Sequence, residues 1–105
     1  MPLSPVNFYE PSADVNRTIS KNSFVTLDVG ASTRAIIVTI GASDARCSMV
    51  MVSTSSAGVT NLIPVKTGSD IVYDTTTDYK IKVTNNNANA TTLYAFNLSE
   101  NGGIS

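Results

Sequence analysis

The sequence predicts an all-β protein, an antiparallel β-sandwich of about seven strands. Apolar and polar residues alternate with a period of two in several short segments, as in residues 79–84 (YKIKVT). Clusters of Gly, Ser, Thr, Asn and Asp interrupt these segments roughly every ten residues, which is typical of turns between short strands. No segment has apolar residues at the spacing of an amphipathic helix.

The first five strands are expected at residues 24–29, 34–40, 47–52, 59–65 and 71–73. The run at 34–40 (RAIIVTI) is apolar almost throughout, which is typical of a central strand covered on both sides or nearly so. The next run (CSMVMV) is also apolar on both faces. Pro64 cannot donate a hydrogen bond to a neighbouring strand, so the fourth strand is expected at a sheet edge or ending at Ile63.

The last two strands are expected to form an antiparallel hairpin within residues 78–98, closed by an asparagine-rich tip at residues 85–90. Alternation places Tyr79 on the core side of the first of these strands. It places Tyr94 and Phe96 on one side of the second, and we expect that side to be the core side too. The polar face of the first strand and the tip then remain available to partners.

Two sandwich topologies fit this number of strands, a jelly roll and an immunoglobulin-like pair of sheets. True immunoglobulin domains carry a core tryptophan between two cysteines. This chain has no tryptophan and a single cysteine, Cys47. A jelly-roll-like sandwich is therefore favoured.

Residues 1–20 differ from the rest and are expected to form an extended N-terminal arm, with the sandwich domain at residues 21–105. Prolines at positions 2, 5 and 11 oppose a helix or a central strand. Apolar side chains nevertheless recur in this segment, and we expect them to bind a surface: Leu3, Val6, Phe8 and Tyr9. That surface belongs either to the same domain, with the arm as an edge strand, or to a neighbouring subunit. Both alternatives remain open at this point.

The composition predicts a polar but weakly charged surface. Charged residues make up 14% of the 105 residues, against roughly 25% in typical soluble domains. Thirteen threonines and ten asparagines take their place. Such a surface suits exported or virion proteins, and contacts that desolvate few charges; it equally suits a protein that simply uses hydroxyls and amides. The net charge is −1 and the seven basic residues are scattered, which argues against nucleic-acid binding.

The residues of common catalytic and metal sites are missing from the sequence. The chain has no histidine, so Cys47 lacks the usual base of a catalytic thiol and no zinc site can form. We expect Cys47 to be a buried, small apolar side chain. Asp70, Asp74 and Asp78 flank a short strand and are expected to form turns. We therefore expect no enzyme, no catalytic residue, no metal and no cofactor.

Neither a signal peptide nor a membrane span is expected. No apolar run approaches 18 residues, and the first twelve residues lack the basic start and apolar core of a signal peptide. We expect a protein made in the cytoplasm that reaches any other location by assembly or lysis and does not insert into a membrane.

Three residues are candidates for binding a glycan on a host surface. Tyr73 is the best placed aromatic side chain for stacking on a sugar, and Asn86 and Asn87 lie in the polar tip. The loop at residues 53–58 would complete such a site. This predicts a carbohydrate-binding module as the alternative to a structural protein.

The sandwich region resembles the small β-sandwich modules of bacteriophage virions, found in fibre tips and capsid decoration proteins. The segments that carry the resemblance are RAIIVTI at 34–40, MVMV at 49–52 before a Ser/Gly loop, KIKVTN at 80–85 and TLYAFNL at 92–98. The resemblance implies a non-enzymatic role on the virion surface, often as a homotrimer. It also implies attachment of the arm to capsid or tail proteins. No functional residue is carried over from it.

Overall fold

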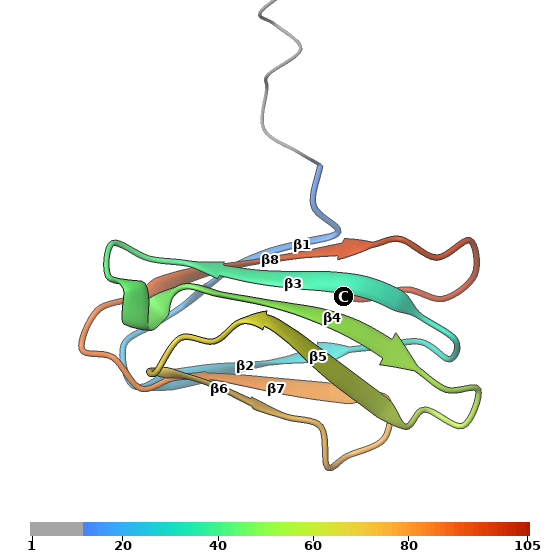
Figure 1. The fold of residues 1–105 in the computed structure, drawn as a ribbon. Helices are drawn as coiled ribbons and strands as arrows, with labels where there is room; N and C mark the ends of the chain where they lie inside the picture. Colours follow the sequence, from blue (N-terminus) through green and yellow to red (C-terminus); the bar gives the residue numbers. More distant parts are fainter. Residues whose placement is uncertain (1–11) are drawn as a thin grey trace, which may run out of the picture.

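The computed structural model describes residues 12–105, which form two antiparallel sheets packed face to face (Figure 1). The five-stranded sheet has the order β1-β8-β3-β4-β5 and the three-stranded sheet has the order β2-β7-β6. A single turn of 3₁₀ helix, η2 (Asp44–Arg46), joins β3 to β4. The strands are β1 (Val15–Ile19), β2 (Ser23–Asp28), β3 (Arg34–Ile40), β4 (Ser48–Thr54), β5 (Thr60–Lys66), β6 (Ile71–Asp74), β7 (Lys80–Asn85) and β8 (Thr91–Asn97).

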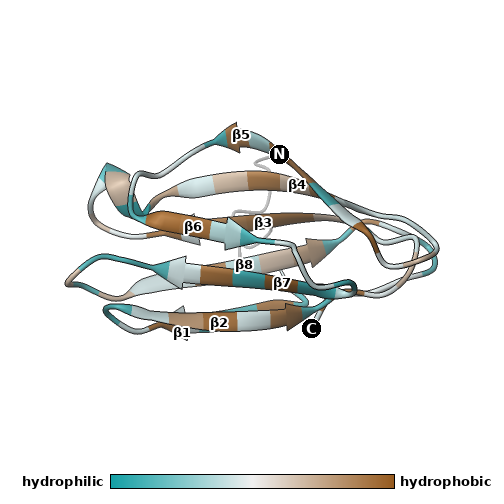
Figure 2. Ribbon diagram, turned by 90° about the horizontal axis from the view of Figure 1, so that it is seen from below, coloured by the Kyte–Doolittle hydropathy of each residue, from teal (hydrophilic) through white to brown (hydrophobic). Residues whose placement is uncertain are grey.

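The predicted all-β sandwich is confirmed, and its core lies between the two sheets. Alternate residues of the strands point into it, so brown and teal residues alternate along β7 in Figure 2. The core consists mainly of aliphatic side chains, among them Leu27, Ile37, Ile81, Val83 and Leu93, each fully buried. Tyr73 packs against this cluster from its margin.

β1 lies inside the segment expected to be an arm, for which an edge strand of the same domain was one of the two alternatives. It is an edge strand of the five-stranded sheet, but the sequence did not predict its bounds. Its two ends, Val15 and Ile19, are buried, while the three residues between them are exposed. This pattern lacks a period of two, so nothing in the sequence distinguished it from a loop. β1 pairs with β8 along its full length, so the five-stranded sheet includes residues 15–19.

The predicted hairpin at residues 78–98 is wrong. β7 pairs with β2 and β6, whereas β8 pairs with β1 and β3, so the asparagine-rich segment crosses from one sheet to the other. The sheets of a sandwich lie about 10 Å apart, a gap that five residues span easily. Alternation within a strand does not reveal which strand pairs with it, and this is why the sequence suggested a hairpin.

The predicted core side of β8 is also wrong, as is the core position of Tyr79. Leu93 and Ala95 are fully buried in β8, while Tyr94 and Phe96 lie on the opposite side and are half-buried. Tyr79 precedes β7 and is 42% exposed, with a left-handed backbone conformation (φ 62°) that an aromatic residue seldom adopts.

The strand pairing is only partly that of a jelly roll. The first strand pairs with the last and the second with the seventh, which is the nested pairing of that topology. In a jelly roll the third strand would pair with the sixth; here β3 lies between β8 and β4, and β6 pairs with β7. β5 forms an edge of its sheet, as Pro64 predicted, and its register shifts near Met49.

The last residues of the chain are attached to the sandwich. Ile104 is buried and forms a β-bridge with Val29. Thr33 is fully buried, and its Oγ1 accepts a hydrogen bond from the Gly103 N–H at 2.9 Å. Within residues 12–105, no helix has the length and apolar composition needed to cross a membrane.

Candidate functional site

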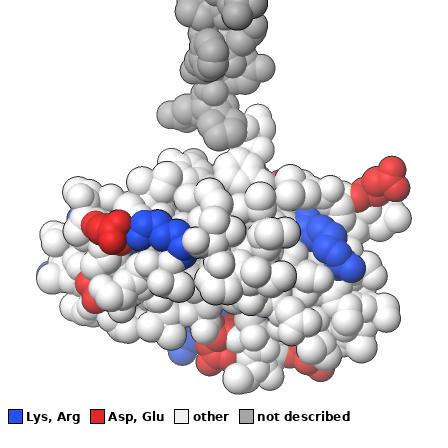
Figure 3. Space-filling view, viewed as in Figure 1, with Lys and Arg blue, Asp and Glu red and all other residues white. Residues whose placement is uncertain are grey.

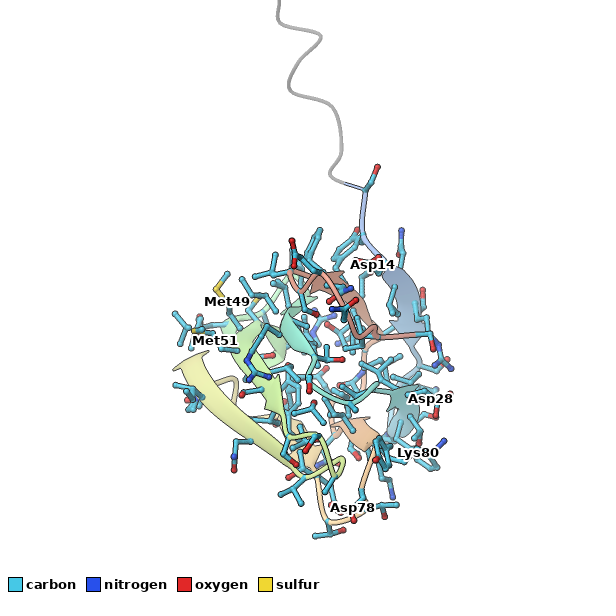
Figure 4. The ribbon with its side chains drawn as sticks, turned by 90° about the vertical axis from the view of Figure 1, so that its right-hand side faces the viewer. Asp14, Asp28, Met49, Met51, Asp78 and Lys80 are labelled. Atoms are coloured by element: carbon cyan, nitrogen blue, oxygen red, sulfur yellow. The ribbon has the colours of Figure 1, made fainter. Side chains whose placement is uncertain are left out.

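The main candidate for a binding surface is the outward side of the five-stranded sheet, which we call the outer face. It consists of the outward-pointing apolar side chains of four adjacent strands: Ile36, Val38, Ile40, Met49, Met51, Ile63, Tyr94 and Phe96. Met51 is 47% exposed and Ile63 is 56% exposed. Figure 4 shows Met49 and Met51 pointing away from the core. β3 and β4 are thus apolar on both sides, as predicted, but only their inner side is covered within residues 12–105.

Cross-strand pairing arranges all of these side chains except Ile40 in two rows. One row runs Phe96, Ile36, Met51, Ile63 across four strands. The other row runs Tyr94, Val38, Met49 across three strands, and Tyr94 lies opposite Asn16 of β1. Directly opposite side chains in a sheet lie about 5 Å apart, so each row is a continuous apolar strip.

The outward side of the three-stranded sheet is different, because four charged side chains (Asp28, Asp74, Lys80 and Lys82) lie there beside the exposed Phe24 and Val72. Lys80 and Asp28 form an ion pair across β7 and β2, and Figure 4 shows them side by side. Lys82 lies over the ring of Phe24, 4.2 Å from its centroid. In the view of Figure 3, the charged side chains form small separate groups on an otherwise uncharged surface. The two sides of the sandwich therefore suit different kinds of contact.

A second candidate is a groove of about 350 Å³ between β5 of one sheet and β6 of the other. Tyr73 lines it together with Leu62, Pro64 and Lys66. The Tyr73 hydroxyl is 2.7 Å from Ser48 Oγ, which is in turn 2.6 Å from Thr39 Oγ1. Burial raises the pKa of the Tyr73 hydroxyl, and its hydrogen bonds with Ser48 and Thr39 offset part of that shift.

The structure separates the three glycan-contact candidates. Asn86 is exposed on the crossing segment, and Asn87 donates a hydrogen bond from Nδ2 to Asp70 Oδ2 at 2.7 Å. Neither asparagine lines the groove that contains Tyr73. The apolar arm residues Leu3, Val6, Phe8 and Tyr9 lie outside the described residues.

Asn85, assigned to the exposed tip by its sequence context, is fully buried and structural. Its Nδ2 donates to the carbonyl oxygens of Asn89 at 2.9 Å, Ile19 at 3.2 Å and Ser20 at 3.4 Å. Its Oδ1 accepts a hydrogen bond from the Asn87 N–H at 3.0 Å. One side chain thus joins β7, the end of β1 and the segment that crosses between the sheets.

The remaining polar candidates have local structural roles. The N–H and hydroxyl of Thr76 both donate to the Asp74 carboxylate and hold its pKa below the usual range, as expected for a turn. Cys47 was expected to be buried, but it is only half-buried, and its thiol donates to the Gly41 carbonyl at 3.3 Å. Within residues 12–105, no three His, Cys, Asp or Glu side chains are grouped closely enough to hold a metal ion.

The outer face was not identified from the sequence, although its signal was present. Residues 34–40 and 47–52 are apolar on both sides, which we interpreted as strands covered twice. The same pattern arises when a sheet has one side in the core and the other available to a partner.

Comparison with known proteins gives no relative: no protein family, no curated protein and no solved structure matches this chain.

Proposed function

We propose that the protein is a non-enzymatic structural protein of a virion, either a capsid decoration protein or a fibre-associated module. It binds neighbouring subunits through its N-terminal arm and its sheet surfaces and edges. Copies of the chain form a homo-oligomer, which the resemblance to phage modules implies is a trimer. Capsid or tail proteins are its other partners. The resemblance of the strand segments to those modules supports this proposal.

The observation that carries the proposal is the outer face. Eight apolar side chains on four adjacent strands form one contiguous surface, and four of them are at least 38% exposed. The largest apolar patch on a typical monomer is about 300–600 Å² and often functional. A surface of this kind is suited to permanent contact with another protein.

Deletion of residues 1–11 should abolish self-association. An apolar side chain that is buried in a contact contributes about 1.5–3 kcal/mol, so losing Leu3, Val6, Phe8 and Tyr9 should weaken the contact more than about 100-fold. Size-exclusion chromatography with light scattering measures the resulting mass. Density-gradient sedimentation measures whether the shortened chain still accompanies virus particles from its native source.

A full-length variant with serine at these four positions is the matched control, because it keeps the length of the arm and removes only its apolar side chains. It should behave like the deletion. Unchanged mass and unchanged sedimentation with particles in both variants would contradict the role of the arm.

The second candidate function is recognition of a surface glycan. The groove favours it, because Tyr73 lines this concave site with polar neighbours such as Asn61 and Thr75. A glycan array is the direct test, with Asn61→Ala as a groove variant and Asn86→Ala as a variant outside the groove. A glycan bound by the intact protein and lost only in Asn61→Ala would support this function; an array without reproducible binding would contradict it.

A further inference from the structure

We propose that the outer face binds residues 1–11 of a neighbouring copy of this chain. The inference rests on the proposed function, since it takes self-association through the arm and assigns the surface that receives it. That surface is a sheet face rather than a sheet edge, and it is the five-stranded sheet rather than the three-stranded one.

The segment is long enough to cross the outer face. Leu3 and Tyr9 are six residues apart, so an extended chain between them spans about 20 Å. The four strands of the outer face are separated by three spacings of about 4.8 Å, or about 14 Å across. An extended segment laid along one row therefore reaches every strand of the outer face, with Leu3 and Tyr9 on one side of the segment and Val6 and Phe8 on the other.

The chemistry of the two surfaces also agrees. Glu10 is the only charged side chain within residues 1–11. Within the two rows, from Phe96 to Ile63 and from Tyr94 to Met49, no side chain is charged. The charges lie at the ends: Asp14, which accepts a hydrogen bond from the Asn97 N–H, beside Phe96, and Lys66, paired with Asp44 at 2.9 Å, opposite Met49. Covering the rows with this segment thus desolvates few charges, and charge desolvation is the usual penalty for burying a surface. On the three-stranded sheet the same segment would cover Lys80, Asp28 and Lys82.

The path of the chain favours a neighbouring copy over the same copy. Asp14 is fixed beside Phe96, because its N–H donates to the Ala95 carbonyl at 2.9 Å and its carboxylate accepts from the Asn97 N–H at 2.7 Å. The described residues before Asp14 rise away from the sheet instead of running along it (Figures 1 and 4).

Cysteine cross-linking between differently tagged copies tests the proposal. In a Cys47→Ser background, one chain carries Phe8→Cys and the other carries Met51→Cys. The matched control replaces Met51→Cys with Val72→Cys, since both positions are 47% exposed strand residues but lie on opposite sheets. After mixing and mild oxidation, intact-mass spectrometry should detect the 8–51 disulfide between copies well above the 8–72 level.

Charge substitution gives a second measurement that needs no cysteine. Met51→Lys places an unpaired charge in the middle of the outer face and should weaken self-association roughly tenfold or more, while Val72→Lys should leave it unchanged. Thermal unfolding of both variants verifies that the sandwich is intact. Met51 and Val72 are both exposed, so neither change should alter the melting temperature by more than a few degrees.

Each outcome separates the two proposals. If Phe8→Cys and Met51→Cys form a disulfide only when both are placed in the same chain, the assignment to a neighbouring copy is overturned. If Met51→Lys weakens self-association but no 8–51 disulfide forms, the arm is not what covers the outer face. That result would indicate that the outer faces of two copies pack against each other. If deleting residues 1–11 abolishes association but neither Met51 variant differs from its Val72 control, the proposed function survives and this inference fails. If the deletion changes nothing, the proposed function itself fails.

Discussion

Asn85→Asp should destabilise the protein by about 4 kcal/mol, a large part of the roughly 5–15 kcal/mol typical of a domain. The amide group of Asn85 is fully buried and donates to three backbone carbonyl oxygens. A carboxylate in its place would face those oxygens with a negative charge and without a proton to donate. Urea unfolding at neutral pH, followed by fluorescence or circular dichroism, measures the loss.

The effect should depend on pH in a definite direction. Protonation of the introduced carboxyl group removes its charge and restores one donor, so the penalty should be largest at neutral pH and shrink as the pH falls toward about 4. Asn86→Asp is the matched control, because the same substitution one residue later lies on an exposed position and should cost less than about 0.5 kcal/mol. Equal effects at the two positions would contradict the structural role of Asn85.

Gly58→Ala should destabilise the protein by about 3 kcal/mol, through strain and a steric clash. Gly58 has a positive φ of 86°, and an added Cβ would lie 2.5 Å from Cε2 of the Tyr79 ring. The ring cannot move freely, because the Tyr79 N–H donates to the Gly58 carbonyl at 2.9 Å and its hydroxyl reaches the Ser56 carbonyl. Urea unfolding of the unsubstituted protein and of Gly58→Ala measures the difference in the free energy of unfolding.

Two further variants separate the two contributions. In a Tyr79→Ala background the clash is removed, so Gly58→Ala should cost only the backbone strain, about 1 kcal/mol. Gly103→Ala is the control, since nothing lies within 4 Å of its added Cβ, and it should be nearly neutral. A Gly58→Ala cost that is the same with and without the Tyr79 ring would contradict the proposed clash.

The sequence predicted the structure correctly where burial or backbone hydrogen bonding determines the residue types along a strand. Residues 34–40 were predicted as a central strand, and β3 has those bounds and lies in the middle of its sheet. Alternation in β7 correctly placed Ile81 and Val83 in the core and Lys80 and Lys82 outside. A missing N–H at Pro64 correctly predicted an edge strand.

The sequence was uninformative where two arrangements satisfy the same pattern. In β8, Leu93 and Ala95 lie on one side and Tyr94 and Phe96 on the other, and the larger size of the aromatic pair suggested that it faces the core. The sheet buries the smaller pair in its core and leaves the aromatic pair on the outer face. Asn85 looked like its neighbours in a polar run, because its role depends on carbonyl groups brought together only by the fold.

Light scattering of the intact chain, eluted from a size-exclusion column over a range of concentrations, tests the account most directly. The outer face and the apolar arm together predict self-association, with a mass that is a multiple of the 11.1 kDa chain. Three times that mass would agree with the trimer implied by the resemblance to phage modules. A mass of 11.1 kDa at every concentration would contradict the account, because the outer face would then remain uncovered by any second copy.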